Sequence, residues 1–192
     1  IVGMPGTGKT NFSLGLLMQF WRDFQIPFLV IEPTKNEYRS LVDAIPDIQI
    51  FTPGKEDVSP YIINPFIPPD NVTVETYAPG LMTAFKAAFN MPSPLPNVFT
   101  NAINNAYVKY GWKKRSTSAD PDVEKFGMYE FIRVFKQVAS NLGYKGESKA
   151  NIESAGVLRL VSLIEQNSNI YDTVNTIPLQ DLLNKPTIIE LN

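Results

Sequence analysis

Gly3-Met4-Pro5-Gly6-Thr7-Gly8-Lys9-Thr10 is the stretch of sequence that decides the fold of this chain. A glycine, four further residues and then Gly-Lys-Thr is the spacing of a phosphate-binding P-loop. Glycines let the backbone curl closely enough for successive N–H groups to point at phosphate oxygens, and the helix after the loop adds its own unpaired N–H groups. The stretch therefore predicts a site for ATP.

Each residue type in this loop has a predicted task. In the P-loop pattern the Lys9 ammonium faces the β- and γ-phosphates, and the Thr10 hydroxyl takes a coordination position on Mg²⁺. Lys9 is therefore also a candidate catalytic residue, Thr10 is the candidate metal ligand, and the expected cofactors are ATP and Mg²⁺. The predicted nucleotide-binding residues are Gly3, Pro5, Gly6, Thr7, Gly8, Lys9, Thr10 and Asn11.

The sequence on both sides of the loop supports this interpretation over a glycine-rich turn before an ordinary helix. Ile1-Val2 is apolar, like the end of a strand, and an amphipathic helix is predicted from Lys9 to about Phe24. A P-loop normally follows a full strand of about 5 residues. We therefore expect that this strand is cut and that the sequence is a fragment.

Strands and helices alternate after the loop, which predicts an α/β fold with a parallel sheet and a right-handed crossover. The wide apolar face of the first helix predicts packing against the sheet. The apolar run at residues 27–31 is typical of a strand buried on both faces. Further strands are predicted at residues 48–51, 61–64 and 186–191, and a short helix at residues 36–44.

The apolar period changes from strand to helix in the middle of the chain. Four amphipathic helices are predicted around residues 81–89, 99–110, 131–142 and 152–164. The economical interpretation is one α/β core with a helical insertion. Residues 1–69 form the first part of the core, residues 70–170 the insertion and residues 171–192 the return to the core.

Composition excludes several kinds of chemistry. The 192 residues include no cysteine and no histidine, so disulfides, thiolate zinc sites and Ser-His or Cys-His relays cannot form. A net charge of -2 gives no general attraction to nucleic acid. No apolar run approaches the roughly 18 residues of a membrane span. The lack of cysteine fits a reducing compartment, and we expect a cytoplasmic protein with no membrane partner.

Glu32 is a second candidate catalytic residue. It ends the second predicted strand, at the edge of a parallel sheet where ligands bind and where the loop also belongs. A carboxylate there can orient the attacking water. The alternative is a solvated or salt-bridged glutamate, paired for example with Lys35.

A basic cluster on the predicted insertion is the candidate DNA-binding site. It consists of Lys109, Lys113, Lys114 and Arg115, with Tyr110 and Trp112 between them. Cations with interleaved aromatic rings can hold nucleic-acid phosphates and stack a base. A solvated helix end and loop is the alternative interpretation.

Two segments are informative together: the loop from Gly3 to Asn11 and the run Val30-Ile31-Glu32-Pro33-Thr34-Lys35-Asn36-Glu37-Tyr38-Arg39-Ser40-Leu41. They resemble the HerA-like (DUF87-type) ATPases of the HerA/FtsK branch of P-loop NTPases. Asn64-Pro65-Phe66 and the segment 182–191 are similar to that family as well. The resemblance implies a RecA-like ATPase core, assembled as a hexameric ring that moves DNA, with a nuclease as a further partner. It also implies that the Walker B carboxylates and the arginine finger would lie beyond residue 192.

We therefore expect the ATP-binding portion of a motor ATPase that couples hydrolysis to DNA translocation or processing, as in a DNA translocase or helicase. This fragment alone is expected to be inactive. Two alternatives stay open. One is a non-catalytic nucleotide-binding switch module, and the other is a small-molecule kinase, which would need an arginine-bearing lid.

Overall fold

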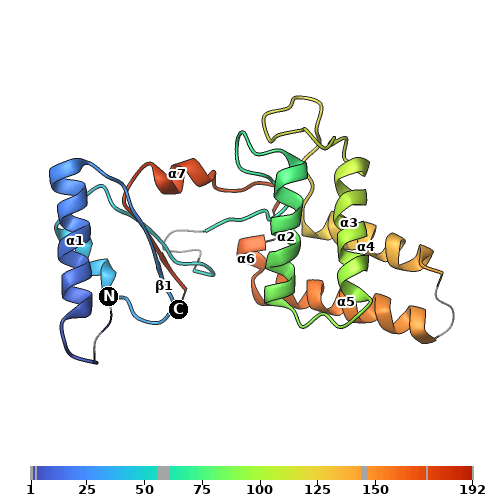
Figure 1. Ribbon diagram of the computed structural model, residues 1–192, viewed down its shortest axis with the longest axis horizontal. Coiled ribbons are helices and arrows are strands. Elements are labelled where there is room, and N and C mark those ends of the chain that lie inside the picture. The colour runs from blue at the N-terminus through green and yellow to red at the C-terminus, as the bar shows by residue number, and fades with distance from the viewer. Residues whose placement is uncertain (1, 3, 56–60, 144–146, 172, 192) are drawn as a thin grey trace. The chain divides into compact units, whose positions relative to one another are not determined.

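The computed structural model describes residues 2, 4–55, 61–143, 147–171 and 173–191. The chain divides into two compact units (Figure 1). The first, which we call the α/β unit, comprises Ile1–Tyr61 and Ile177–Asn192, and the second, the helical unit, comprises Ile62–Thr176. The helical unit is therefore an insertion between two parts of the α/β unit.

A three-stranded parallel sheet lies at the centre of the α/β unit. Its strands are β1 (Leu29–Glu32), β2 (Gln49–Phe51) and β3 (Thr187–Glu190), in the order β1-β3-β2. β3 comes last in the sequence but forms the middle of the sheet. All four of its residues are buried. The predicted α/β class and parallel pairing are confirmed.

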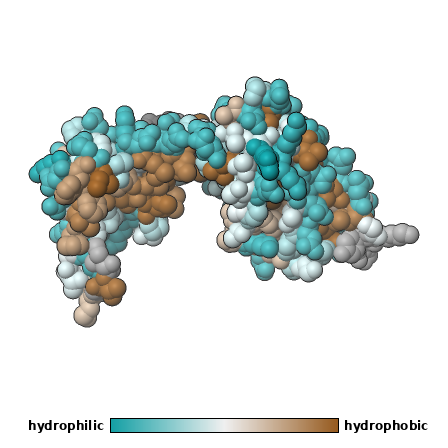
Figure 2. Space-filling view, turned by 45° about the horizontal axis from the view of Figure 1, so that its top comes forward, coloured by the Kyte–Doolittle hydropathy of each residue, from teal (hydrophilic) through white to brown (hydrophobic). Residues whose placement is uncertain are grey.

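Helix α1 (Lys9–Phe24) begins and ends where the sequence predicts, but its apolar face is not buried. Phe12 and Phe24 are 61% and 63% exposed, and none of the 16 residues of α1 is buried. Ile31 of β1 is also 59% exposed, so the prediction of a strand buried on both faces was wrong. No described segment covers these side chains, and Figure 2 shows hydrophobic residues on the surface of the α/β unit.

Two smaller predictions also change. Residues 61–64 form no strand, and the side chain of Asn64 donates to the backbone oxygens of Phe126 (2.8 Å) and Val174 (3.1 Å). These bonds tie the segment to the helical unit, which therefore begins at residue 62 rather than 70 and ends at 176 rather than 170. The short helix predicted at residues 36–44 is a 3₁₀ helix, η1 (Tyr38–Asp43).

The four predicted helices of the insertion are confirmed. They are α2 (Val74–Ala88), α3 (Leu95–Lys109), α4 (Met128–Asn141) and α5 (Glu147–Gln166). Two short helices, α6 (Ser168–Tyr171) and α7 (Leu179–Leu183), were not predicted, and α7 belongs to the α/β unit. None of the described helices is long and apolar enough to cross a membrane.

Phenylalanine rings form the core of the helical unit. The rings of Phe66 and Phe131 lie 4.6 Å apart between centroids, and those of Phe99 and Phe135 lie 4.8 Å apart. All four side chains are fully buried. Gly156 lets α5 approach this core, since a Cβ atom at that position would lie 2.1 Å from Cζ of Phe135.

Candidate functional site

The predicted loop leads directly into α1. Gly6 and Gly8 have φ angles of 79° and 81°, in the left-handed region that residues with a side chain rarely adopt. No heavy atom would lie within 4 Å of a Cβ atom at either glycine, so backbone conformation rather than space requires them. Gly3 and Ile1 lie outside the described residues, and Val2 is in no strand.

Side chains of the loop converge on one backbone oxygen. Nζ of Lys9 donates to the carbonyl of Met4 at 2.7 Å, and Oγ1 of Thr7 donates to the same carbonyl at 2.7 Å. The carbonyl thus holds the Lys9 ammonium over the loop. A phosphate bound there would compete with Met4 for the same ammonium.

The described nucleotide-binding candidates form one continuous surface at the start of α1. Pro5, Gly6, Thr7, Gly8 and Asn11 are exposed, and Lys9 and Thr10 are partly buried. Gly8, the residue that precedes α1, makes no side-chain cap, and the first turn of α1 holds no acidic residue. The positive end of the helix dipole therefore has no compensating carboxylate on the helix itself.

Glu32 has a structural role at the end of β1. Only 5% of it is exposed, and its carboxylate accepts hydrogen bonds from the backbone N–H groups of Glu37 (2.9 Å) and Tyr38 (3.4 Å). It thereby fixes the turn that starts η1. The sequence suggested Lys35 as its ion-pair partner, but Nζ of Lys35 lies 3.4 Å from Oε1 of Glu37 instead.

Glu37 is the carboxylate that meets the loop, and the sequence pattern did not place it in the site. The Thr10 side chain, followed by that of Lys35, whose Nζ lies 3.4 Å from Oε1 of Glu37, holds the pKa of Glu37 below its ordinary value. The signal was its position in the loop after β1, at the carboxyl edge of a parallel sheet.

Glu190 is paired with Arg39 at the same edge of the sheet. Nε and Nη2 of Arg39 lie 3.0 Å and 2.6 Å from the two carboxylate oxygens, and Oγ1 of Thr52 lies 3.2 Å from one of them. Glu190 is fully buried, and the Arg39 guanidinium holds its pKa below the ordinary value. The pair ties the ends of β2 and β3 to η1.

The donor set near the loop suits Mg²⁺ only together with a nucleotide. No group of three or more acidic residues that could hold a metal occurs among the described residues. Mg²⁺ is commonly held by one or two carboxylates and substrate phosphates rather than by a protein cage. The Thr10 hydroxyl, in the first turn of α1, would be one protein oxygen beside such phosphates.

The two aromatic rings of the basic cluster pack against the helical unit to different extents. Trp112 is only 2% exposed, and its Nε1 donates to the backbone oxygen of Glu124 at 2.8 Å. The ring of Tyr110 stacks on Phe126, with 4.9 Å between centroids. The prediction that Trp112 stacks a base was therefore wrong, because its ring is buried, whereas Tyr110 is only partly buried and its part in stacking stays a prediction.

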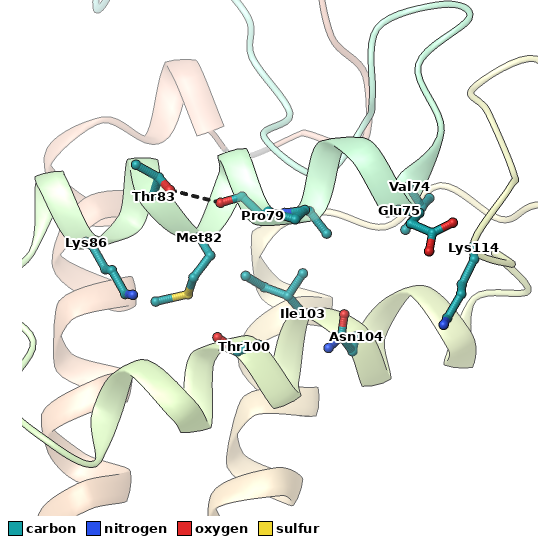
Figure 3. A pocket seen from close by; sticks show the side chains of 11 residues that line it. Val74, Glu75, Pro79, Met82, Thr83, Lys86, Thr100, Ile103, Asn104 and Lys114 are labelled. Carbon is teal, nitrogen blue, oxygen red and sulfur yellow. Dashed lines mark hydrogen bonds between the residues drawn. The ribbon is translucent and has the colours of Figure 1, made fainter.

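The cations of the cluster remain at the surface. Lys109, Lys113, Lys114 and Arg115 are all exposed, and within the described part of the chain none of them lies in a salt bridge. Lys114 also lines a groove of about 450 Å³ between α2 and α3, with Met82 and Ile103 at its floor and Lys86 at its other end (Figure 3). The cluster therefore offers exposed charge beside the partly buried ring of Tyr110, whose centroid lies 5.7 Å from Nζ of Lys109.

Comparison with known proteins adds no family. No protein-family model matches the chain, and no curated protein matches it significantly. The resemblance to HerA-like ATPases therefore stays a prediction, and the geometry that bears on function is that of the loop, Thr10 and Glu37.

Proposed function

We propose that this chain is the ATP-binding portion of a P-loop motor ATPase with a RecA-like core. The observation that carries the proposal is the loop at residues 4–8, in which Gly6 and Gly8 adopt φ angles of 79° and 81° and place Lys9 and Thr10 in the first turn of α1. An ordinary turn before a helix needs no pair of left-handed glycines followed by Lys-Thr.

Phosphate chemistry fits this arrangement. The first N–H groups of a helix lack partners within the helix, and its dipole favours a negative charge at that end. In α1 neither Gly8 nor an acidic side chain meets this need. Phosphate oxygens would supply both the hydrogen-bond acceptors and the charge. The Lys9 ammonium would then exchange the Met4 carbonyl for the terminal phosphates.

The DNA-translocating role is part of the same proposal and comes from the resemblance to HerA-like ATPases. The exposed cations of the basic cluster support it, since Lys109, Lys113 and Arg115 can meet backbone phosphates without a base-stacking ring. In this proposal DNA is bound through its charge alone, and a ring of identical subunits strengthens a contact that is weak in one copy.

ATP binding tests the proposal through Lys9. ATP and Mg²⁺ at about 100 times the dissociation constant should stabilise the protein by about 2.7 kcal/mol, a rise in melting temperature of about 5–10 °C. Lys9→Ala should lose most of this rise, because it removes the cation that faces the phosphates while alanine preserves the helix. Differential scanning calorimetry with and without ATP measures both.

Lys86→Ala is the matched control, since Lys86 is also a helical lysine but belongs to α2 in the other unit. Its ATP-induced shift should equal that of the wild type. An ATP-induced shift that is the same in Lys9→Ala as in the wild type would remove the loop from the proposal.

A further inference from the structure

The carbonyl oxygen of Met4 accepts hydrogen bonds from three donors. The backbone N–H of Thr7 donates to it at 3.3 Å, Oγ1 of Thr7 at 2.7 Å and Nζ of Lys9 at 2.7 Å. A carbonyl oxygen has two lone pairs, so the three donors share two acceptor positions. The carbonyl therefore stays satisfied when one of its donors leaves.

Pro5 and Gly6 explain why this carbonyl faces Thr7. Residues 4–7 form a turn in which the fourth N–H bonds back to the first carbonyl. Proline in the second position and a glycine with φ of 79° in the third are the features of a type II turn.

The two bonds by which Thr7 closes the turn differ in length. The backbone N–H bond, at 3.3 Å, is longer than the usual range of about 2.7–3.2 Å, whereas the hydroxyl bond of 2.7 Å has the usual length for an O–H donor. The hydroxyl of Thr7 is thus the stronger of these two links to Met4.

Lys9 and Thr7 differ in how easily they can leave the carbonyl. The ammonium of a lysine ends a flexible four-carbon chain, so it can turn to another acceptor without a change in the backbone. The hydroxyl of Thr7 is attached directly to the turn that it closes. When a phosphate attracts the Lys9 ammonium, the Thr7 hydroxyl is therefore the short bond that remains on Met4.

We propose that Thr7 is a positioning residue of the phosphate site, whose hydroxyl keeps the turn at residues 4–7 closed while Lys9 transfers from Met4 to the phosphates of a bound nucleotide. This inference rests on the proposed function. The Thr7 hydroxyl acts through Lys9 and makes no contact with the nucleotide itself. Its effect on ATP affinity should therefore depend on the presence of the Lys9 ammonium.

Thr7→Val is the first test, because valine keeps the β-branched shape and removes the hydroxyl. Isothermal titration calorimetry with ATP and Mg²⁺ should show a dissociation constant about fivefold higher than that of the wild type, which is the worth of one ordinary hydrogen bond. Thr7→Ser restores the hydroxyl and should bind ATP as the wild type does.

A double-mutant cycle with Lys9→Ala separates action through Lys9 from direct binding. In the Lys9→Ala background the carbonyl has no ammonium to release, so Thr7→Val should leave the dissociation constant unchanged. Titration followed by NMR measures the weaker binding of these two variants.

Thr83→Val is the matched control. Oγ1 of Thr83 also donates to a backbone oxygen, that of Pro79 at 3.0 Å, but it belongs to α2 in the other unit. Its ATP affinity should equal that of the wild type. Circular dichroism should show that all variants are folded.

Three results would overturn the inference. One is wild-type ATP affinity in Thr7→Val, and another is a Thr7→Ser variant that loses as much affinity as Thr7→Val. The third is an equal loss with and without the Lys9 side chain, which would mean that the Thr7 hydroxyl binds the nucleotide directly. All three leave the proposed function intact if Lys9→Ala still loses ATP binding. Unchanged ATP binding in Lys9→Ala would instead reject the proposed function itself.

Discussion

The two units of this chain differ in how far their large apolar side chains are buried. In the helical unit Phe66, Phe99 and Phe131 are fully buried, whereas in the α/β unit Phe12, Phe24 and Ile31 are each more than half exposed. Both sets come from regular apolar patterns. The difference shows that periodicity predicts which face of an element is apolar, while burial requires a second layer to cover that face.

The candidate site and the densest packing therefore lie in different units. The glycine loop, Thr10 and Glu37 lie in the unit with the thinner core, and the densely packed aromatic core lies in the inserted unit. Sites that bind ligands are commonly drawn from the less stable parts of a protein. Paired substitutions, one in each unit, can test this contrast.

Truncation of a buried ring should have the largest effect. Phe131→Ala should destabilise the helical unit by about 3–5 kcal/mol, because it leaves a cavity among Phe66, Phe85 and Phe99. Phe12→Ala in α1 should change stability by less than about 0.5 kcal/mol, since Phe12 is 61% exposed. Urea unfolding followed by circular dichroism measures both. Equal losses in the two variants would show that α1 has a partner in solution.

Replacing a helical glycine by alanine should change stability in opposite directions in the two units. Gly156→Ala in α5 should destabilise by about 1–3 kcal/mol, since the new Cβ would meet the packed ring of Phe135 at 2.1 Å. Gly15→Ala in α1 should stabilise by about 0.5–1 kcal/mol, because no atom lies within 4 Å and alanine favours the helix. Thermal melts of the two variants test the pair, and a stabilised Gly156→Ala would refute the close approach of α5.

Removal of Arg39 should have a smaller effect that depends on pH. Arg39→Ala leaves the buried Glu190 carboxylate without its ion pair and should cost about 1–2 kcal/mol at pH 7. Because Arg39 lowers the pKa of Glu190 in the folded state, its stabilisation is present above the ordinary value of 4.5 and is lost as pH falls through the lowered pKa. Urea unfolding at several pH values measures this.

The difference between wild type and Arg39→Ala should therefore shrink below pH 4.5. Lys35→Ala, which breaks the exposed pair with Glu37, should show no measurable loss at either pH. A difference between wild type and Arg39→Ala that stays constant with pH would mean that the Glu190 charge is not what Arg39 stabilises.

The sequence predicted helices and strands better than it predicted which side chains contact one another. The 3.6-residue period located α1 and the four long helices of the insertion, and short β-branched runs located the three strands. Residues 61–64 also looked like a strand, but Asn64 bonds to backbone oxygens 62 and 110 residues away, which no local pattern encodes.

The candidate site was predicted in part for the same reason. The spacing from Gly6 to Thr10 is local, so it indicated the loop and its need for glycine. Glu37 was missed because its place near α1 depends on how α1 and η1 pack. The backbone partners of Glu32 could not be foreseen from the sequence, and its catalytic role stays a prediction. Trp112 has lysine neighbours in sequence, yet its ring turns into the core.

The two ends of the helical unit lie against each other. The backbone N–H of Ile63 donates to the oxygen of Ile170 at 2.9 Å, and the Asn64 side chain reaches the oxygen of Val174 at 3.1 Å. A domain insertion whose two ends are neighbours can be removed with little change to the rest of the chain, because a short linker can join the two flanking residues. Evolution or an engineer can therefore exchange residues 62–176 for another fold while the glycine loop and Glu37 stay in their own framework.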